Sequence, residues 1–258
     1  MPIAPLAYKY VVTAVMLMEI NYCASRLPLP LDHPVCRADL RRTFIPHPRI
    51  MGVSGTFYTD KCIFSFAKSS RLKYIVNRTN PRYYMEGGSP EMNAYLLGLT
   101  HVRSLIDTNG AHRLATNWLT ALEVDVPRLE KEHHWKAEQM KLMGTQPIPM
   151  FEVTWDNGGR LLSNGDPALP TISVLIAGDT RQIIHIRQED DSYSKRPKAL
   201  IKDIYQLLAI PDSEFLKYTE EQRSNLVARL AAVKYPPLTN FPGAAQRRTT
   251  SGKAPEKQ

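Results

Sequence analysis

The chain has few cysteines and carries none of the short motifs that mark a metal site or a phosphate-binding loop. Its three cysteines, Cys23, Cys36 and Cys62, lie in no CxxC spacing, and an odd number cannot all pair within one chain. A disulfide scaffold is therefore excluded, although a single Cys23–Cys36 bridge stays open; apolar surroundings favour buried thiols at Cys23 and Cys62. HExxH, GxGxxG and Walker motifs are absent, so we expect no metal ion and no cofactor.

Long hydrophobic runs are also missing. The most apolar stretch, Val11–Met18 (VVTAVMLM), has eight residues, too few to cross a bilayer. Lys9 precedes it as in a signal peptide, but Glu19 follows at once and Cys23-Ala24-Ser25 is a poor cleavage site. We interpret the stretch as a buried helix of the folded domain and leave export open.

Charge is unevenly distributed along the chain, which has a net charge of +8. Residues 1–88 carry 12 basic and 5 acidic side chains, residues 89–191 carry 9 and 14, and residues 192–258 carry 12 and 6. This layout suits complementarity within the molecule as well as an external anion. The N-terminal arginines sit in a proline-rich connection rather than on one element between aromatic residues, which argues against nucleic-acid binding.

The order helix, then β-meander, occurs twice and predicts an α+β fold in which helices pack on antiparallel meanders, with a possible duplication of the unit. The first unit pairs a helix at Tyr8–Arg26, ended by Pro28, with alternating strands across Gly55–Val76. In the second, Asp107 caps a helix over Gly110–Leu122. Its apolar stripe is Ala111, Leu114, Ala115, Trp118, Leu119 and Leu122. Strands at Met150–Trp155 and Thr171–Arg187 follow, with Ile184 and Ile186 on one face.

Three further helices are expected: Ser89–Ile106, a charged and exposed one at Pro127–Met143, and an amphipathic one at Ser213–Val233. The predicted organisation is a helix-plus-meander unit at 1–88, a helical segment with a second meander at 89–198, and a C-terminal helical segment at 199–235. A basic tail at 236–258, rich in small and polar residues, is predicted to be disordered.

A helix that leads into a strand, a loop and the hairpin ISVLIAGDTRQIIHI resembles PepSY-like modules. The resemblance covers residues 108–190 and extends in element order to 11–78, although Gly178-Asp179-Thr180-Arg181 lacks the Thr-Gly pair typical of such hairpins. It implies a small α+β unit of a class that is usually exported and associated with the inhibition or regulation of peptidases. No functional residue is carried over from the family.

Catalytic candidates are sparse. Asp107 and His112 could form an acid–base pair at a helix start, but a capping aspartate explains Asp107 equally well. Gly52-Val-Ser54-Gly55 lacks the second glycine of a nucleophile elbow and predicts a loop. His185 alternates with Ile184 and Ile186 and is expected on the outer surface of the sheet. Asn77-Arg78-Thr79 fits a glycosylation acceptor, a triplet common by chance.

The densest group of ligand-type side chains is Glu130, Glu132, His133 and His134. Adjacent histidines on a helix point about 100° apart, so they cannot easily hold one ion, and a solvated helix face is the favoured interpretation.

Two functions remain. The favoured hypothesis is a non-catalytic module that binds a protein or peptide, at an open sheet edge or in a groove between helix and sheet. The alternative is a hydrolase whose residues meet only in the fold, with Asp107, His112, His133 and His134 as candidates.

Overall fold

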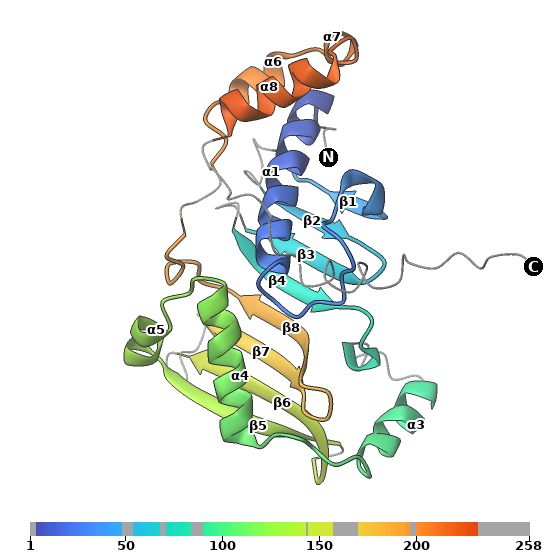
Figure 1. The fold of residues 1–258 in the computed structure, drawn as a ribbon, viewed down its shortest axis with the longest axis vertical. Coiled ribbons are helices and arrows are strands. Elements are labelled where there is room, and N and C mark those ends of the chain that lie inside the picture. Colours follow the sequence, from blue (N-terminus) through green and yellow to red (C-terminus); the bar gives the residue numbers. More distant parts are fainter. Residues whose placement is uncertain are drawn as a thin grey trace, which may run out of the picture.

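In the computed structural model the described residues, 4–47, 54–67, 71–83, 90–142, 144–156, 170–196 and 200–231, build one antiparallel sheet covered by helices (Figure 1). The sheet has eight strands in the order β1-β2-β3-β4-β8-β7-β6-β5. Each half is thus a meander, and the last strands of the two halves, β4 and β8, pair in the middle. The predicted α+β class with antiparallel strands is confirmed, and the mirrored order repeats the helix-then-meander plan; common ancestry of the halves stays a prediction.

The first half consists of one long helix and four short strands. These are α1 (Leu6–Ala24), β1 (Arg42–Phe44), β2 (Gly55–Tyr58), β3 (Cys62–Phe66) and β4 (Leu72–Asn77). The alternating aromatic residues Phe57, Phe64 and Phe66 all point into the large core that α1 covers. β1 was not expected, because it consists of only three residues within the proline-rich connection.

The second half is covered by an amphipathic helix, as the apolar stripe predicts. Its elements are α3 (Pro90–Leu99), α4 (Thr108–Ala121), α5 (Val126–Glu132), β5 (His134–Leu142), β6 (Gln146–Asp156), β7 (Ile172–Ala177) and β8 (Gln182–Gln188). Trp118 and Leu122 are 7% and 8% exposed and share the large core with Val174, whereas Leu114 is only partly buried. α3 is shorter than the predicted Ser89–Ile106, and Ser89 lies outside the described residues.

The charged helix predicted at Pro127–Met143 is wrong. Only its first part is helical, in α5, and the chain then turns into β5, which pairs with β6 along its length. Charged residues at every second position, such as Lys136 and Glu138, fit one face of an edge strand as well as they fit a solvated helix. The charge of the segment concealed its period.

Two β-bulges overturn the expected alternation of apolar residues. In β8 the register shifts, so Ile183 and Ile186 enter the large core while Ile184 joins a second cluster beneath α3 on the other side of the sheet. A shift opposite Ser65 and Phe66 does the same in β4, where Leu72 and Ile75 enter the large core. An extra residue on one strand moves the following side chains to the other face.

The C-terminal helix predicted at Ser213–Val233 is divided. The described chain forms α6 (Ile204–Ala209), α7 (Asp212–Phe215) and α8 (Glu220–Leu230), and Thr219 starts α8 with a capping box that Gln222 completes. These helices pack around the N-terminal half of α1 (Figure 1). The predicted tail at 236–258 lies outside the described residues.

The described helices include none with the length and apolar character needed to cross a membrane. All three cysteines are free; Cys23 and Cys62 are buried, as predicted, and Cys36 is exposed. Asn77, in the glycosylation triplet, is 2% exposed, and its amide donates to the backbone oxygen of Ile183 at 3.0 Å.

Candidate functional site

The residues of the proposed acid–base pair have different partners. Asp107 caps α4, where its Oδ1 accepts from the backbone nitrogen of Gly110 at 2.7 Å. His112 instead lies one turn into the helix, with its Nε2 2.9 Å from Glu130 and its ring stacked on Trp135 at 3.8 Å. Asp107 therefore has the capping role that the sequence offered as its simpler explanation.

The neighbouring histidines also serve separate purposes. The Nε2 of His133 lies 2.6 Å from the Tyr193 hydroxyl, which donates to Glu132 at 2.7 Å. The Tyr193 hydroxyl proton is used in the bond to Glu132, so the hydroxyl oxygen accepts from His133. The hydrogen-bond network therefore places the imidazole proton on His133 Nε2. His134 is exposed at the start of β5. Over the described ranges, no group of three or more histidine, cysteine, aspartate or glutamate residues is placed to hold a metal ion.

His185 faces away from the large core, as expected, but it is half-buried rather than exposed. Its ring lies 5.6 Å from that of Tyr74 on the neighbouring strand. Burial and, to a smaller extent, the nearby positive charge of Arg187 lower the pKa of His185 to about 4. The imidazole is therefore neutral at physiological pH.

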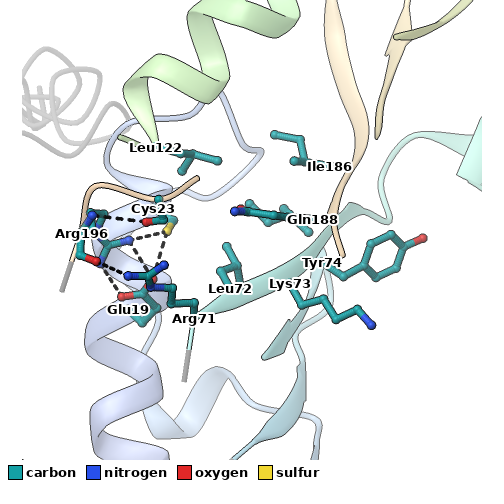
Figure 2. Close-up of a pocket in the computed structure, with 12 residues that line it drawn as sticks. Glu19, Cys23, Arg71, Leu72, Lys73, Tyr74, Leu122, Ile186, Gln188 and Arg196 are labelled. Atoms are coloured by element: carbon teal, nitrogen blue, oxygen red, sulfur yellow. Dashed lines mark hydrogen bonds and ion pairs between the residues drawn. The ribbon is translucent and has the colours of Figure 1, made fainter. Parts of the chain in front are cut away.

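A buried ion pair lies where α1 meets the segment after β8 (Figure 2). The guanidinium of Arg196 forms a two-pronged contact with the Glu19 carboxylate, at 2.7 Å on one prong, and both side chains are at most 10% exposed. The same guanidinium lies 3.6 Å from the Cys23 sulfur and 3.8 Å from the centre of the Tyr22 ring. Burial raises the pKa of the Cys23 thiol well above its usual range, so this cysteine is not an activated nucleophile.

The segment that carries Arg196, residues 190–196, is held from both halves of the molecule. Arg71, just before β4, donates to the backbone oxygens of Asp191 and Arg196. On the side of the second half, the backbone nitrogen of Asp125 donates to the backbone oxygen of Tyr193 at 2.7 Å. The backbone nitrogen of Lys195 donates to the backbone oxygen of Glu123 at 2.8 Å. We call residues 190–196 the strap, because they fasten α1 to the α4–α5 connection.

The cavity at this ion pair is too small for a substrate. It holds about 20 Å³, close to the space of a single water molecule. Figure 2 shows Arg196, Glu19 and Cys23 turned toward one another rather than toward open solvent. The cluster is therefore a structural junction.

A much larger groove lies between α1 and the β1 edge. Its volume is about 510 Å³. The apolar part of its lining includes Ala4, Leu40, Ile45 and Pro46, and the polar part includes Lys9 and Arg37. Size and mixed lining suit a few residues of peptide or a small molecule.

Two cations are placed differently in this groove. Arg37 is held by Tyr10 of α1. Its Nη2 donates to the backbone oxygen of Tyr10 at 2.6 Å, and its guanidinium lies 3.8 Å from the centre of the Tyr10 ring. Burial lowers the pKa of Arg37, though a guanidinium stays charged at any physiological pH. Lys9 is half-buried and forms no ion pair with any residue in the described ranges.

One wall of the groove is the first strand of the sheet. β1 pairs only with β2, through Arg42↔Tyr58, Thr43↔Phe57 and Phe44↔Thr56. All three β1 residues are exposed, and Phe44 is 48% exposed. An edge strand directs backbone donors and acceptors outward, and within the described chain no other strand pairs with them.

Sequence reasoning missed these groove residues. Lys9 and Arg37 lie 28 positions apart and meet only because the proline-rich connection folds back along α1. The single local signal was Arg-Thr-Phe-Ile at 42–45, a short apolar run before Pro46 that could have suggested an edge strand.

Comparison with known proteins yields no match: no family model, no curated protein and no solved structure is similar to this chain. The PepSY-like resemblance therefore stays a prediction.

Proposed function

We propose that this protein binds an extended segment of another protein at the β1 edge, with side chains of that segment seated in the groove beside α1. The observation that carries the proposal is the coincidence of an exposed edge strand with the groove of about 510 Å³. Extended peptides add to such edges through main-chain hydrogen bonds, while adjacent pockets select their side chains.

The lining supports one class of segment. Leu40, Ile45 and Pro46 offer an apolar surface for an aliphatic or aromatic side chain, while Lys9 and Arg37 provide positive charge. Lys9 forms no ion pair within the described ranges, so its ammonium can meet a carboxylate of the ligand. A segment that combines apolar and acidic residues fits this arrangement best.

The hydrolase alternative gains no specific support from the geometry. Asp107 caps a helix, His112 pairs with Glu130, and His133 pairs with Tyr193. Within the described ranges, no serine, threonine or cysteine side chain is hydrogen-bonded to either histidine.

The stretch that could act as an export signal, Val11–Met18, lies within α1. α1 is the central helix of the first half, and Val11, Val12, Val15 and Met16 on it are at most 1% exposed. Cleavage near Ala24 would therefore remove a core helix. Identification of the mature N-terminus in the source cell would show whether this cleavage takes place.

The test starts from a phage library of random peptides, because the ligand is unidentified. We expect enrichment of peptides that carry an apolar residue next to Asp or Glu, with dissociation constants of about 1–100 μM. Labelled versions of these peptides, titrated against the protein by fluorescence anisotropy, should bind about tenfold more weakly to Lys9→Glu. Leu40→Trp, which fills the groove, should weaken binding at least as much.

The matched control is Lys202→Glu, the same charge reversal at an exposed lysine outside the groove. It should leave peptide affinity unchanged. Equal losses for Lys9→Glu and Lys202→Glu would reduce the effect to net charge, and failure to enrich any shared peptide pattern would overturn the proposal.

A further inference from the structure

The opposite edge of the sheet is a second exposed strand of different character. β5 is nine residues long and pairs only with β6. Four of its residues are half-buried and five are exposed, including Trp135 at 43%. No backbone hydrogen bond joins its outer side to another segment of the described chain. A long edge strand with an open outer side is a template for another strand.

The charges on this strand are self-complementary. Lys136 and Glu138 point to the same face of the sheet, and their side chains form an ion pair at 2.6 Å while each stays more than 60% exposed. If two copies of β5 lie antiparallel about a two-fold axis at Ala137, Lys136 lies opposite the partner subunit's Glu138. Glu138 then lies opposite the partner subunit's Lys136, so one registration makes two cross-strand ion pairs.

The neighbouring positions fit the same registration. The small side chain of Ala137 lies at the axis, where the two copies must approach closely. Trp135 falls opposite the partner subunit's Gln139, on the face of the sheet that α4 covers. The register of β5 shifts between Gln139 and Lys141, so its last residues are less regular. Pairing of two copies about Ala137 uses the stretch from His134 to Met140.

We propose that two copies of this chain associate through β5, antiparallel about Ala137, so that their sheets become one continuous sheet. A two-fold axis perpendicular to the sheet keeps both α4 helices on the same side. Edge pairing buries less surface than a standard interface of about 1,600 Å², so the dimer forms at micromolar rather than nanomolar concentration.

The same features also describe an edge protected against pairing, because lysines and bulges discourage uncontrolled strand addition. The two interpretations differ in what a charge exchange does. A protected edge needs only charge, whereas the dimer needs opposite charges at 136 and 138.

Sedimentation equilibrium over about 5–500 μM separates them, since a weak edge-paired dimer dissociates within this range. We expect a monomer–dimer equilibrium for the natural chain. Glu138→Lys places lysine opposite lysine and should weaken dimerisation at least tenfold. Lys136→Glu should do the same, and the double exchange K136E/E138K should restore the constant to within about threefold.

Arg42→Glu, at the β1 edge, is the matched control and should dimerise like the natural chain. Circular dichroism melting of each variant checks that the fold is retained. A chain that stays monomeric throughout, a double exchange that fails to recover, or an equal loss with Arg42→Glu would each overturn the proposal. None of these outcomes depends on peptide binding in the α1–β1 groove.

Discussion

The two long helices that cover the sheet, α1 and α4, solve the same packing problem in different ways. Fourteen of the 19 residues of α1 are buried, against five of 14 in α4, so α1 is an interior helix and α4 a surface helix. α4 needs only the sheet beneath it. α1 needs a second cover, which the C-terminal helices, the proline-rich connection and the strap supply (Figure 1).

Polar groups on α1 show how this second cover is fixed in place. Asn21 Oδ1 accepts from the backbone nitrogen of Val35 at 2.6 Å, and Asn21 Nδ2 donates to the backbone oxygen of Val35 at 2.9 Å. Glu19 accepts from Arg196 of the strap. Near the start of the helix, the backbone nitrogen of Leu6 donates to Asp212 in α7 at 2.8 Å, and the Tyr10 hydroxyl donates to Glu220 in α8 at 2.7 Å. A helix buried on all sides can carry polar residues only where such partners meet them.

The largest expected effect concerns the strap. Arg196→Met should lower the free energy of unfolding by about 3–5 kcal/mol, because the buried carboxyl group of Glu19 would lose the guanidinium that it contacts. Urea denaturation measures the loss. Glu19→Leu combined with Arg196→Met should recover most of it, since an apolar pair leaves no buried charge; a double variant as unstable as the single one would contradict this account.

In the second half, Trp118→Ala should lower the free energy of unfolding by about 3 kcal/mol. The substitution removes a buried aromatic side chain from the single apolar stripe that packs α4 on the sheet. Thermal melting would detect the loss. Asn117→Ala, on an exposed position of the same helix, is the control and should change stability little. An unchanged melting temperature for Trp118→Ala would show that the stripe does not anchor α4.

A smaller effect is expected at the junction of the halves, where His185 lies. Its pKa in the folded protein is about 4, against about 6.5 when unfolded, so only the unfolded chain takes up a proton between these values. The stabilising contribution is complete above pH 6.5 and falls by about 2 kcal/mol as the pH drops toward 4.5.

Urea denaturation at pH 7 and pH 4.5 tests this pH dependence, with His185→Gln as the comparison. The variant should lose less stability over this interval than the natural chain. Equal losses in both proteins would assign the acid sensitivity to other groups.

Sequence reasoning reached the parts of the fold that repeat at a regular period. The stripe of α4 and the aromatic alternation of β3 needed no tertiary information. It failed at β5, where charge masked a strand, and at Lys73 and Ile184, where a bulge inserts one residue that no local pattern reveals. The groove was beyond reach, because it depends on how the connection after α1 folds back rather than on any motif.

The central pairing of β4 with β8 has a consequence for biosynthesis. Only three residue pairs join these strands, Tyr74↔Arg187, Ile75↔Ile186 and Val76↔His185, and more than one hundred residues of chain separate each pair. A ribosome thus releases the N-terminal meander well before the strand that completes it. Until β8 emerges, the nascent chain presents an uncovered β4 border and a Glu19 without its arginine, which is the interval in which chaperone contact would matter most.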